Sequence, residues 1–384
     1  MNAAYAGFAP VVPVASAGGT ELAGTRRRAA ERRRTPRMER LLILALAVAL
    51  AGCATSRPLA YGPDLQGFNY PYAVRLYSFK TQAQIYAMAY MDVAPPKERL
   101  GERPSLGAGR TVVLLHGEGF CGATWKRTIA GLHAAGFRVV VPDQLAFCKS
   151  SKPINYQYSF EQLAVNTRQL LGSLGAGRII LIGHGMGGML AARYALMYPT
   201  EVSELVLVDP LGLEDWKAQG VLYLTIDERY ALELQNTRAR LKQYELENYY
   251  DGRWRADYDI WLRVLAGLYS GPGRERYAWN QALTSDMIFT QPVVYELDHL
   301  RMPTVLIVGE LDRTDPFRSS APPAVAARLG NYPELGRRAA LRIPHARLIE
   351  LAGVGHVPQL EAPEHFNEVL LQAIASPPAG ARVP

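Results

Sequence analysis

Side chains that can move protons lie in four short, glycine-containing segments of this 384-residue chain. Each segment follows a run of apolar residues. A histidine or a carboxyl group in such a loop can act as a general acid or base, and loop N–H groups can stabilise a developing negative charge. The four segments are His116-Gly117-Glu118-Gly119-Phe120, Gly183-His184-Gly185-Met186-Gly187-Gly188, Gly309-Glu310-Leu311-Asp312-Arg313 and Gly353-Val354-Gly355-His356-Val357-Pro358.

Strands and helices alternate around these segments, and the strands read as short, continuous apolar runs. This pattern predicts a parallel sheet with helices on both faces. The predicted strands are 111–115, 138–141, 178–182, 204–208, 304–308 and 347–351, after a leading hairpin of 72–79 and 84–93. The predicted helices are 124–135, 159–174 with Ser159 as N-cap, 189–198 and 363–375.

Residues 179–190 resemble the nucleophile elbow of the α/β-hydrolase superfamily, the pattern G-x-S-x-G. In that family a strand turns sharply into a helix, and small residues flank the central position. Here Gly183 and Gly187 flank the centre, but the centre is Gly185 rather than serine, cysteine or aspartate. The resemblance covers about residues 70–375. It implies an α/β-hydrolase fold, with a mostly parallel sheet, helices on both faces and an inserted helical lid.

The other motifs of the family follow in its usual order, which is elbow, acid and histidine. The resemblance makes Asp312 the candidate acid and His356 the candidate histidine. It also implies an oxyanion hole, formed by a backbone N–H near Glu118 and the N–H of Met186. The catalytic set implied by the family is therefore Gly185 in the nucleophile position, Asp312 and His356.

Other ionisable residues near these motifs have alternative roles. Asp209, at the end of the preceding strand, is the alternative acid, and Asp315 is a further one. We expect His184 to pack rather than react, and His116 to shape the oxyanion loop. The remaining histidines without a motif are assigned to surface or structural positions: His133, His299 and His345.

The residue at position 185 decides the chemistry. A serine there would attack an acyl carbon while His356 took its proton. Glycine suits the positive-φ backbone that strains other residues at an elbow, but it has no side chain to attack with. Cys121, Ser150 and Ser151 are conceivable substitutes, although none lies on the elbow.

Two functions therefore remain open. The first is hydrolysis of an ester or related acyl bond in a small, largely apolar molecule, with a His356–Asp312 dyad activating water. The second is a catalytically inactive binding protein that keeps the hydrolase fold and its pocket at a membrane surface. Activity measured with and without a serine at position 185 separates them.

Residues 211–300 interrupt the alternation of strands and helices. They carry 14 of the 36 aromatic residues and four of the five tryptophans. This composition predicts a helical lid over a mostly apolar pocket, or a small helical subdomain that packs its own core. The hydrolase core would then comprise residues 71–210 and 301–376.

The formal charge of +7 lies mostly near the start of the chain. Residues 1–52 hold eight arginines and three glutamates, which account for +5 of it. The rest of the chain is nearly neutral, which disfavours nucleic acid as a partner.

The apolar run 41–51 is too short to span a bilayer, which requires about 20 residues. It follows Arg40 and precedes Cys53, the arrangement of an export signal. Leu50-Ala51-Gly52-Cys53 resembles a bacterial lipobox, whose cysteine becomes the lipid-modified N-terminus; an ordinary signal peptide is the alternative. We expect residues 1–37 to be a non-native or disordered extension, 38–52 a lipoprotein signal and 53–70 a tether. The protein would then be lipid-anchored in the bacterial cell envelope, outside the cytoplasm.

Cys121 and Cys148 are the two cysteines that remain. In an oxidising compartment they can form a disulfide, and two buried free thiols are the alternative. No His, Cys and carboxylate cluster has metal-ligand spacing, and there is no P-loop or dinucleotide-binding loop. We therefore expect neither a metal nor an organic cofactor, and the oligomeric state stays open.

Overall fold

The computed structural model describes residues 60–97 and 105–376. The predicted extension, the signal segment and the lipidation site Cys53 lie outside these residues. Within them, no helix is both long and apolar enough to cross a lipid bilayer.

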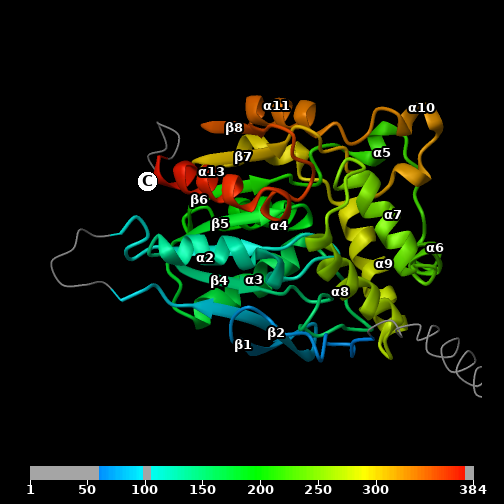
Figure 1. Ribbon diagram of the computed structural model, residues 1–384, viewed down its shortest axis with the longest axis horizontal. Coiled ribbons are helices and arrows are strands. Elements are labelled where there is room, and N and C mark those ends of the chain that lie inside the picture. Colours follow the sequence, from blue (N-terminus) through cyan, green and yellow to red (C-terminus); the bar gives the residue numbers. More distant parts are fainter. Residues whose placement is uncertain (1–59, 98–104, 377–384) are drawn as a thin grey trace, which may run out of the picture. The chain divides into compact units, whose positions relative to one another are not determined.

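Eight strands form one mostly parallel sheet in the order β1-β2-β4-β3-β5-β6-β7-β8 (Figure 1). The leading hairpin is present, because β1 pairs with β2 in antiparallel fashion, and β2 pairs with β4 in the same way. The pairs from β4 to β8 are parallel. The strands are β1 Val74–Thr81, β2 Gln84–Val93, β3 Thr111–Leu115, β4 Arg138–Pro142, β5 Ile179–His184, β6 Val202–Val208, β7 Thr304–Gly309 and β8 Ala346–Leu351.

Successive side chains of the central strands point to opposite faces of the sheet, so each face has its own core. In β3, Val112 and Leu114 pack with Phe366, whereas Val113 and Leu115 pack with Leu163. Both faces of each strand are buried, which explains why the strands read as continuous apolar runs.

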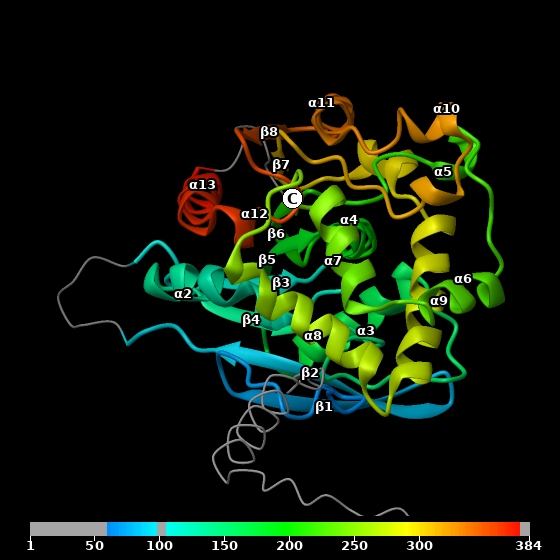
Figure 2. The same ribbon diagram turned by 45° about the vertical axis from the view of Figure 1, so that its right-hand side comes forward.

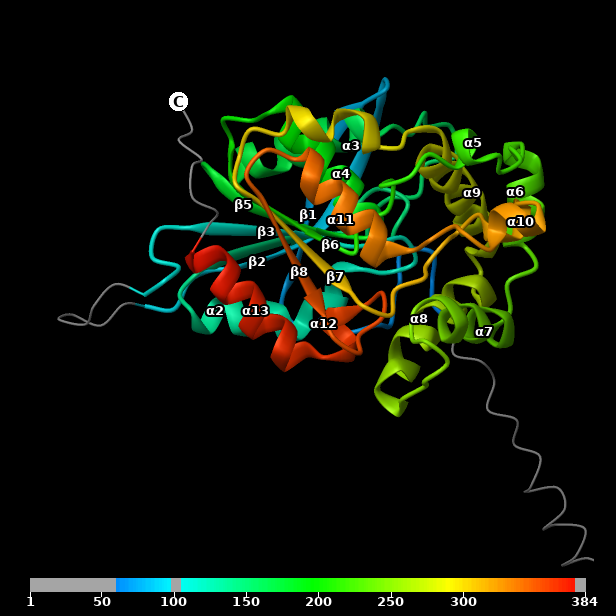
Figure 3. The same cartoon turned by 90° about the horizontal axis from the view of Figure 1, so that it is seen from above.

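The helices of the core divide between these two faces, as Figure 3 shows. Helices α2 and α13 cover one face, and α3, α4 and α11 cover the other. Ser159 caps α3, as predicted, by accepting a hydrogen bond from the Gln162 N–H. The core helices are α2 Lys126–Ala134, α3 Phe160–Ser173, α4 Met186–Met197, α10 Pro323–Ala326, α11 Tyr332–Arg342, α12 Pro358–Glu361 and α13 Pro363–Ala375.

Two predicted helix starts were wrong. Residues Gly122–Trp125 form a separate 3-10 turn, so α2 begins at Lys126 rather than at residue 124. Helix α4 begins at Met186 rather than at residue 189. The glycines at 187 and 188 have the composition of a loop, but close packing against neighbouring backbone holds them in the first turn of the helix.

Five helices lie between β6 and β7 and gather at one end of the sheet (Figures 1 and 2). Several of their aromatic side chains pack on one another. Within residues 211–300, the Trp216 and Phe289 rings stack with centroids 6.5 Å apart, and Tyr250 stacks on Tyr258 at 3.9 Å. The helices are α5 Trp216–Gln219, α6 Ile226–Glu233, α7 Arg238–Asn248, α8 Asp259–Ser270 and α9 Arg274–Thr290.

Residues 60–70 do not form the tether that the sequence predicted. The Tyr61 N–H donates to the Gly267 carbonyl oxygen at 3.1 Å, and Leu65 is fully buried. Phe68 makes an edge contact with Trp261 at a centroid distance of 6.3 Å. These apolar side chains cover α8, so this segment belongs to the folded body.

Candidate active site

The turn between β5 and α4 has the geometry of an elbow. Gly185 lies there with φ +54° and ψ −119°, a backbone conformation that strains residues with a Cβ. The flanking glycines have no room for a side chain. A Cβ on Gly183 would collide with the Gly187 carbonyl oxygen, and one on Gly188 would lie 2.6 Å from the Pro210 Cβ. The elbow is therefore built as in an active enzyme, apart from its central side chain.

His356 and Asp312 form a buried pair at the ends of β8 and β7. The His356 Nδ1 lies 2.9 Å from the Asp312 Oδ2, and the second carboxylate oxygen of Asp312 accepts the Thr314 N–H at 2.8 Å. The two side chains are buried in the protein. An Nδ1–H that donates to the carboxylate leaves Nε2 with a free lone pair, the state required of a general base.

Two further residues hold the imidazole of His356. The lid residue Tyr249 accepts the His356 backbone N–H through its carbonyl at 2.9 Å, and its ring stacks on the imidazole at a centroid distance of 5.0 Å. The His184 Nε2 donates to the His356 carbonyl oxygen at 2.9 Å. Burial lowers the pKa of His184 well below its usual value, and His356 lowers it further, so His184 stays neutral and packs as predicted.

The basic nitrogen of His356 faces the position that a nucleophile would occupy. A Cβ built on Gly185 would lie 3.4 Å from the His356 Nε2 and 3.6 Å from the Gly117 Cα, at normal contact distances. A cavity of about 10 Å3 lies here, lined by Gly185, His356 and Glu118 among others. This is about the volume that one water molecule requires.

The predicted oxyanion donors border the same cavity. Among the described residues, neither the Glu118 N–H nor the Met186 N–H has a hydrogen-bond acceptor. Both are therefore available to an oxyanion. His116 shapes this loop, as expected. Its Nδ1 donates to the Gly117 carbonyl oxygen at 2.8 Å, and its Nε2 accepts the Gln144 N–H at 3.0 Å.

The two alternative acids have other partners. The Asp209 Oδ1 accepts the Gly309 N–H at 2.8 Å, which ties the end of β6 to the acid loop. Burial raises the pKa of Asp209 well above its usual value, and the nearby charge of Asp312 raises it further. The Asp315 carboxylate accepts the Trp216 Nε1–H at 3.2 Å and holds the lid instead. Asp312 is thus the acid that bonds to His356.

A possible metal-ligand set coincides with this pair. One ligating atom from each of Asp209, Asp312 and His356 lies within 4.8 Å of the others. The sequence spacing gave no sign of this cluster, because the three residues come from different strand ends. The Nδ1 of His356 is already engaged with Asp312 at hydrogen-bond distance, so this arrangement is that of an acid–base dyad.

The side chains considered as substitute nucleophiles are engaged elsewhere. The Ser150 hydroxyl donates to the Asp143 carbonyl oxygen at 2.6 Å, and the Ser151 hydroxyl accepts the Ala87 N–H at 3.0 Å. Cys121 and Cys148 are buried and carry free thiols in this structure, and the disulfide stays a prediction. The Cys148 thiol instead donates to the Phe120 carbonyl oxygen at 3.4 Å. Of the histidines without a motif, His133 is half-buried, and His299 and His345 are exposed.

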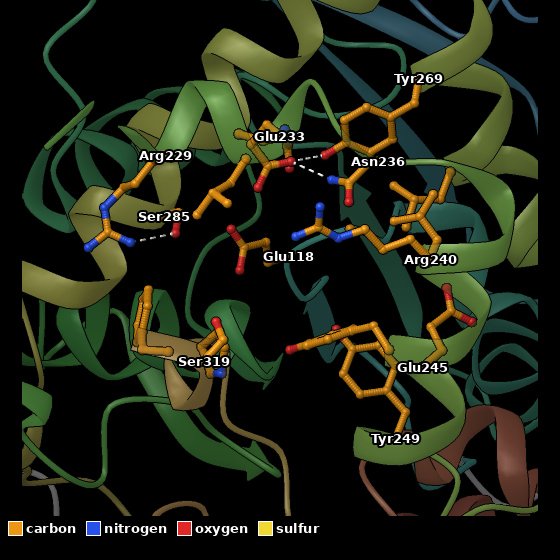
Figure 4. A pocket seen from close by; sticks show the side chains of 18 of the residues that line it. Glu118, Arg229, Glu233, Asn236, Arg240, Glu245, Tyr249, Tyr269, Ser285 and Ser319 are labelled. Atoms are coloured by element: carbon orange, nitrogen blue, oxygen red, sulfur yellow. Dashed lines mark hydrogen bonds between the residues drawn. The ribbon is translucent and has the colours of Figure 1, made fainter. Parts of the chain in front are cut away.

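A larger pocket of about 230 Å3 lies under the lid and shares Glu118, Phe120, Tyr244 and Tyr249 with the small cavity (Figure 4). Its wall is mostly apolar, as predicted, because leucine and aromatic side chains supply the larger part of the lining. Charged, amide and hydroxyl groups alternate with them. All four lid tryptophans pack elsewhere, and none lines this pocket. The polar lining residues are Glu118, Arg229, Glu233, Asn236, Arg240, Glu245, Gln281, Ser285, Ser319 and Ser320.

Burial changes the charge of two of these carboxyl groups. It raises the pKa of Glu118 to about 8, with a further contribution from the charge of Glu233, and it raises the pKa of Glu245 to about 8. At neutral pH both groups are mostly protonated. The sequence gave no signal for the lid residues of the site, because they lie more than 100 positions away from Glu118 of the oxyanion loop.

The comparisons with known proteins agree with this geometry. Residues 110–363 match the family model described as alpha/beta hydrolase fold. A curated relative is the "Putative carbamate hydrolase RutD" of Pantoea ananatis, 26% identical over 277 residues, which cover 70% of this chain and 91% of that protein.

Solved structures show the same fold. A probable hydrolytic enzyme from Pseudomonas aeruginosa PAO1 is 53% identical, with a TM-score of 0.79 over 83% of this chain and 99% of that one. A thermophilic esterase from Thermogutta terrifontis is 20% identical, with a TM-score of 0.58 over 79% of this chain and 100% of that one. Since the family model covers well over half of the chain, this protein belongs to the α/β-hydrolase-fold family.

Proposed function

We propose that the protein hydrolyses an ester or related acyl bond in a small molecule, with water in place of a nucleophilic side chain. The observation that carries this proposal is the His356 Nε2, which faces a cavity of about 10 Å3 in the space that an elbow side chain would fill. Asp312 holds the opposite ring nitrogen at 2.9 Å. The His356–Asp312 pair can therefore still remove a proton. The proton comes from water instead of from a serine hydroxyl.

The reaction follows from these positions. The His356 Nε2 takes a proton from water as the water oxygen bonds to the acyl carbon. The resulting oxyanion accepts the N–H groups of Glu118 and Met186. As the bond to the leaving oxygen or nitrogen breaks, the imidazolium returns its proton to the leaving group, and a carboxylic acid is released. Asp312 accepts the Nδ1–H of His356 throughout and keeps the imidazole oriented.

The related proteins support hydrolysis as the reaction class. The structure that is 53% identical comes from a probable hydrolytic enzyme, and the relative that is 26% identical is described as a carbamate hydrolase. Serine hydrolases without triad members still accelerate hydrolysis ~10³–10⁴-fold over water. An acceleration of this size is the expectation for the present site.

Steady-state hydrolysis of a panel of p-nitrophenyl esters tests the proposal. The chain as it stands should exceed the buffer rate, and His356→Ala should lower the rate by about 100-fold because the general base is lost. The matched control is His299→Ala, because His299 is exposed, belongs to no site motif and lines neither cavity. This control should keep the full rate. Equal rates for the unaltered chain and His356→Ala would refute the water mechanism.

The second candidate function is ligand binding without turnover. Gly185 favours it, because an elbow with no side chain can form no acyl-enzyme intermediate. In that case the unaltered chain should hydrolyse none of the esters and yet bind some of them in calorimetry. Turnover that depends on His356 would exclude this candidate.

We also propose that the mature protein is attached to a membrane of the bacterial cell envelope by lipid on Cys53. The support is the sequence alone: Arg40, the apolar run 41–51 and the lipobox-like Leu50-Ala51-Gly52-Cys53. Labelled palmitate fed to expressing cells should enter the protein and should be lost in Cys53→Ser. The control Cys121→Ser should keep the label, and label retained in Cys53→Ser would refute the anchor.

A further inference from the structure

The lid pocket contains a buried cation with spare hydrogen-bonding capacity. Arg229 on α6 is only 5% exposed. Its Nε donates to the Leu224 carbonyl oxygen at 3.2 Å, and its Nη1 donates to the Ser285 hydroxyl at 3.3 Å (Figure 4). Among the described residues, its Nη2 has no partner. A buried donor on a charged group costs free energy when it is unmatched, so this atom calls for an anionic acceptor.

Within residues 60–97 and 105–376, no carboxylate lies at hydrogen-bond distance from this charge. The nearest acid in an ion pair with Arg229 is Asp286, whose Oδ1 lies 3.9 Å from the Nε. The guanidinium instead lies over the Phe289 and Phe317 rings, each at 5.1 Å. These rings support the cation and shield it from water, which strengthens its attraction for an anion.

A second unpartnered donor lies on the neighbouring helix. Gln281 on α9 is 3% exposed, and its Nε2 has no hydrogen-bond partner among the described residues. Gln281 is four residues before Ser285, which binds the Arg229 guanidinium, so the two side chains occupy the same face of α9 one turn apart. Both line the pocket. One wall therefore offers a charged and a neutral donor together.

We propose that this wall binds a free carboxylate of the substrate, held by the Nη2 of Arg229 and the Nε2 of Gln281. The substrate class is then a small molecule with a carboxylate at one end and the scissile acyl bond at the other. The lid pocket and the cavity at Gly185 share Glu118 and Phe120 in their walls, so one molecule can reach from the anion site to His356. This inference rests on the proposed hydrolytic function.

The charges of the pocket favour a monoanion. Glu118 is mostly neutral at pH 7, because burial and the charge of Glu233 raise its pKa to about 8, so it does not cancel the charge of Arg229. Figure 4 shows Glu118 between Arg229 and Arg240. Glu233 accepts the Asn236 amide at 2.9 Å in the same wall, and burial raises its pKa; when ionised, it would repel a doubly charged phosphate more strongly than a monoanion. A single carboxylate matches one cation and one amide.

Calorimetric binding tests this site without any need for turnover. The probes are the monoethyl esters of succinate, glutarate, adipate and suberate, each paired with its neutral monoamide counterpart. The chain-length series finds the ester that spans the two cavities. Two charge-assisted hydrogen bonds should make the best acid bind roughly tenfold or more tightly than its amide.

Variants then locate the anion. Arg229→Gln should remove the preference for the acid and leave the affinity for the amide unchanged, and Arg229→Lys should restore part of it. Gln281→Leu should also reduce the preference for the acid. It provides a second test if Arg229→Gln fails to fold. The matched control Arg276→Gln removes an exposed cation of α9 outside the pocket and should keep the full preference.

The outcomes also separate this inference from the proposed function. No preference for the acid in the unaltered chain, or a preference that survives Arg229→Gln, would overturn the carboxylate site even if neutral esters are hydrolysed. A preference that is lost in Arg229→Gln supports the site even if nothing is hydrolysed, and in that case only the hydrolytic function fails.

Discussion

Gly185 holds the elbow at φ +54° without the strain that another residue would carry there. Its replacement therefore affects stability and chemistry in opposite directions. Gly185→Ser should lower the free energy of unfolding by about 1–3 kcal/mol, since the new side chain is strained. The same change should raise kcat by at least about 100-fold, a fraction of the ~10⁶-fold that loss of the serine costs a complete triad.

Urea unfolding and ester hydrolysis measure these two effects. Gly185→Ala is the matched control, because it adds the strain and the Cβ without a hydroxyl. It should lose the same stability and gain no activity. A serine variant as inactive as the alanine variant would mean that the His356 Nε2 cannot activate residue 185.

Asp312 and Asp209 should differ sharply in their response to neutral replacement. Asp312→Asn should abolish turnover, because an amide favours the wrong imidazole tautomer, a change that costs ~10⁴-fold in a serine triad. Asp209→Asn should keep most of kcat, because the amide oxygen of asparagine can still accept the Gly309 N–H, and burial and the charge of Asp312 already raise the pKa of the Asp209 carboxyl. The measurement is kcat of each variant on the best ester. Comparable losses would show that Asp209 has a direct part in the reaction.

Glu245 should make the stability of the protein depend on pH. Burial raises its pKa from 4.5 to about 8, so the folded state keeps a proton that the unfolded chain has lost. The free energy of unfolding should therefore fall as the pH rises from about 4.5 to 8, by up to about 1.4 kcal/mol per pH unit. Glu245→Gln removes this dependence.

Urea titrations at pH 5 and pH 8 check the prediction. Relative to the unaltered chain, Glu245→Gln should be more stable at pH 8 than at pH 5. Glu247→Gln, an exposed change on the same helix, should show no such difference. Identical behaviour of the two variants would contradict the buried, protonated state of Glu245.

At the scale of elements, the turn between β5 and α4 depends on glycines at positions where the packing leaves no room for a side chain. Gly183→Ala should destabilise the fold by about 1–3 kcal/mol or more, because the new methyl group meets the Gly187 carbonyl oxygen. Gly172→Ala is the control, since Gly172 is in α3 with open space around it. Alanine there should stabilise the helix by up to about 1 kcal/mol. Thermal unfolding compares the two, and a harmless Gly183→Ala would contradict the close packing.

The strand ends were predictable from sequence, whereas the lid pocket was not. Asp312 and His356 follow continuous apolar strands, and parallel strands place their carboxyl ends at one edge of the sheet. Local sequence patterns were therefore enough to predict that these two residues lie close together. The start of α4 was missed because glycine composition resembles a loop, while the contact that orders it is with Pro210, distant in the chain.

The lid residues of the site were harder to predict from sequence, because their contacts join residues that are far apart in the chain. Arg229 meets Ser285 on another helix, and Tyr249 reaches His356 more than 100 positions later. The aromatic content of 211–300 predicted a mostly apolar pocket, which is present, but it predicted neither the charged groups in the wall nor the packing of Trp216 on Phe317 outside the pocket. The composition of a segment gives the amount of its apolar surface but not the direction in which its apolar side chains point.

For the whole molecule, the hydrolase core and the lid meet at a site in which, under the proposed mechanism, a water molecule takes the nucleophile's place. The core supplies His356, Asp312 and the oxyanion donors, and the lid supplies Tyr249 and the wall that holds Arg229. Such a molecule should turn over substrate without becoming covalently modified, which distinguishes it from enzymes that form an acyl intermediate.

Intact-protein mass spectrometry during turnover of an activated ester tests this claim most directly. The unaltered chain should release acid at a rate that depends on His356 while its mass stays unchanged. Gly185→Ser should gain the mass of one acyl group, located at residue 185. An acyl adduct on the unaltered chain, at Cys121, Ser150 or any other side chain, would contradict a water nucleophile.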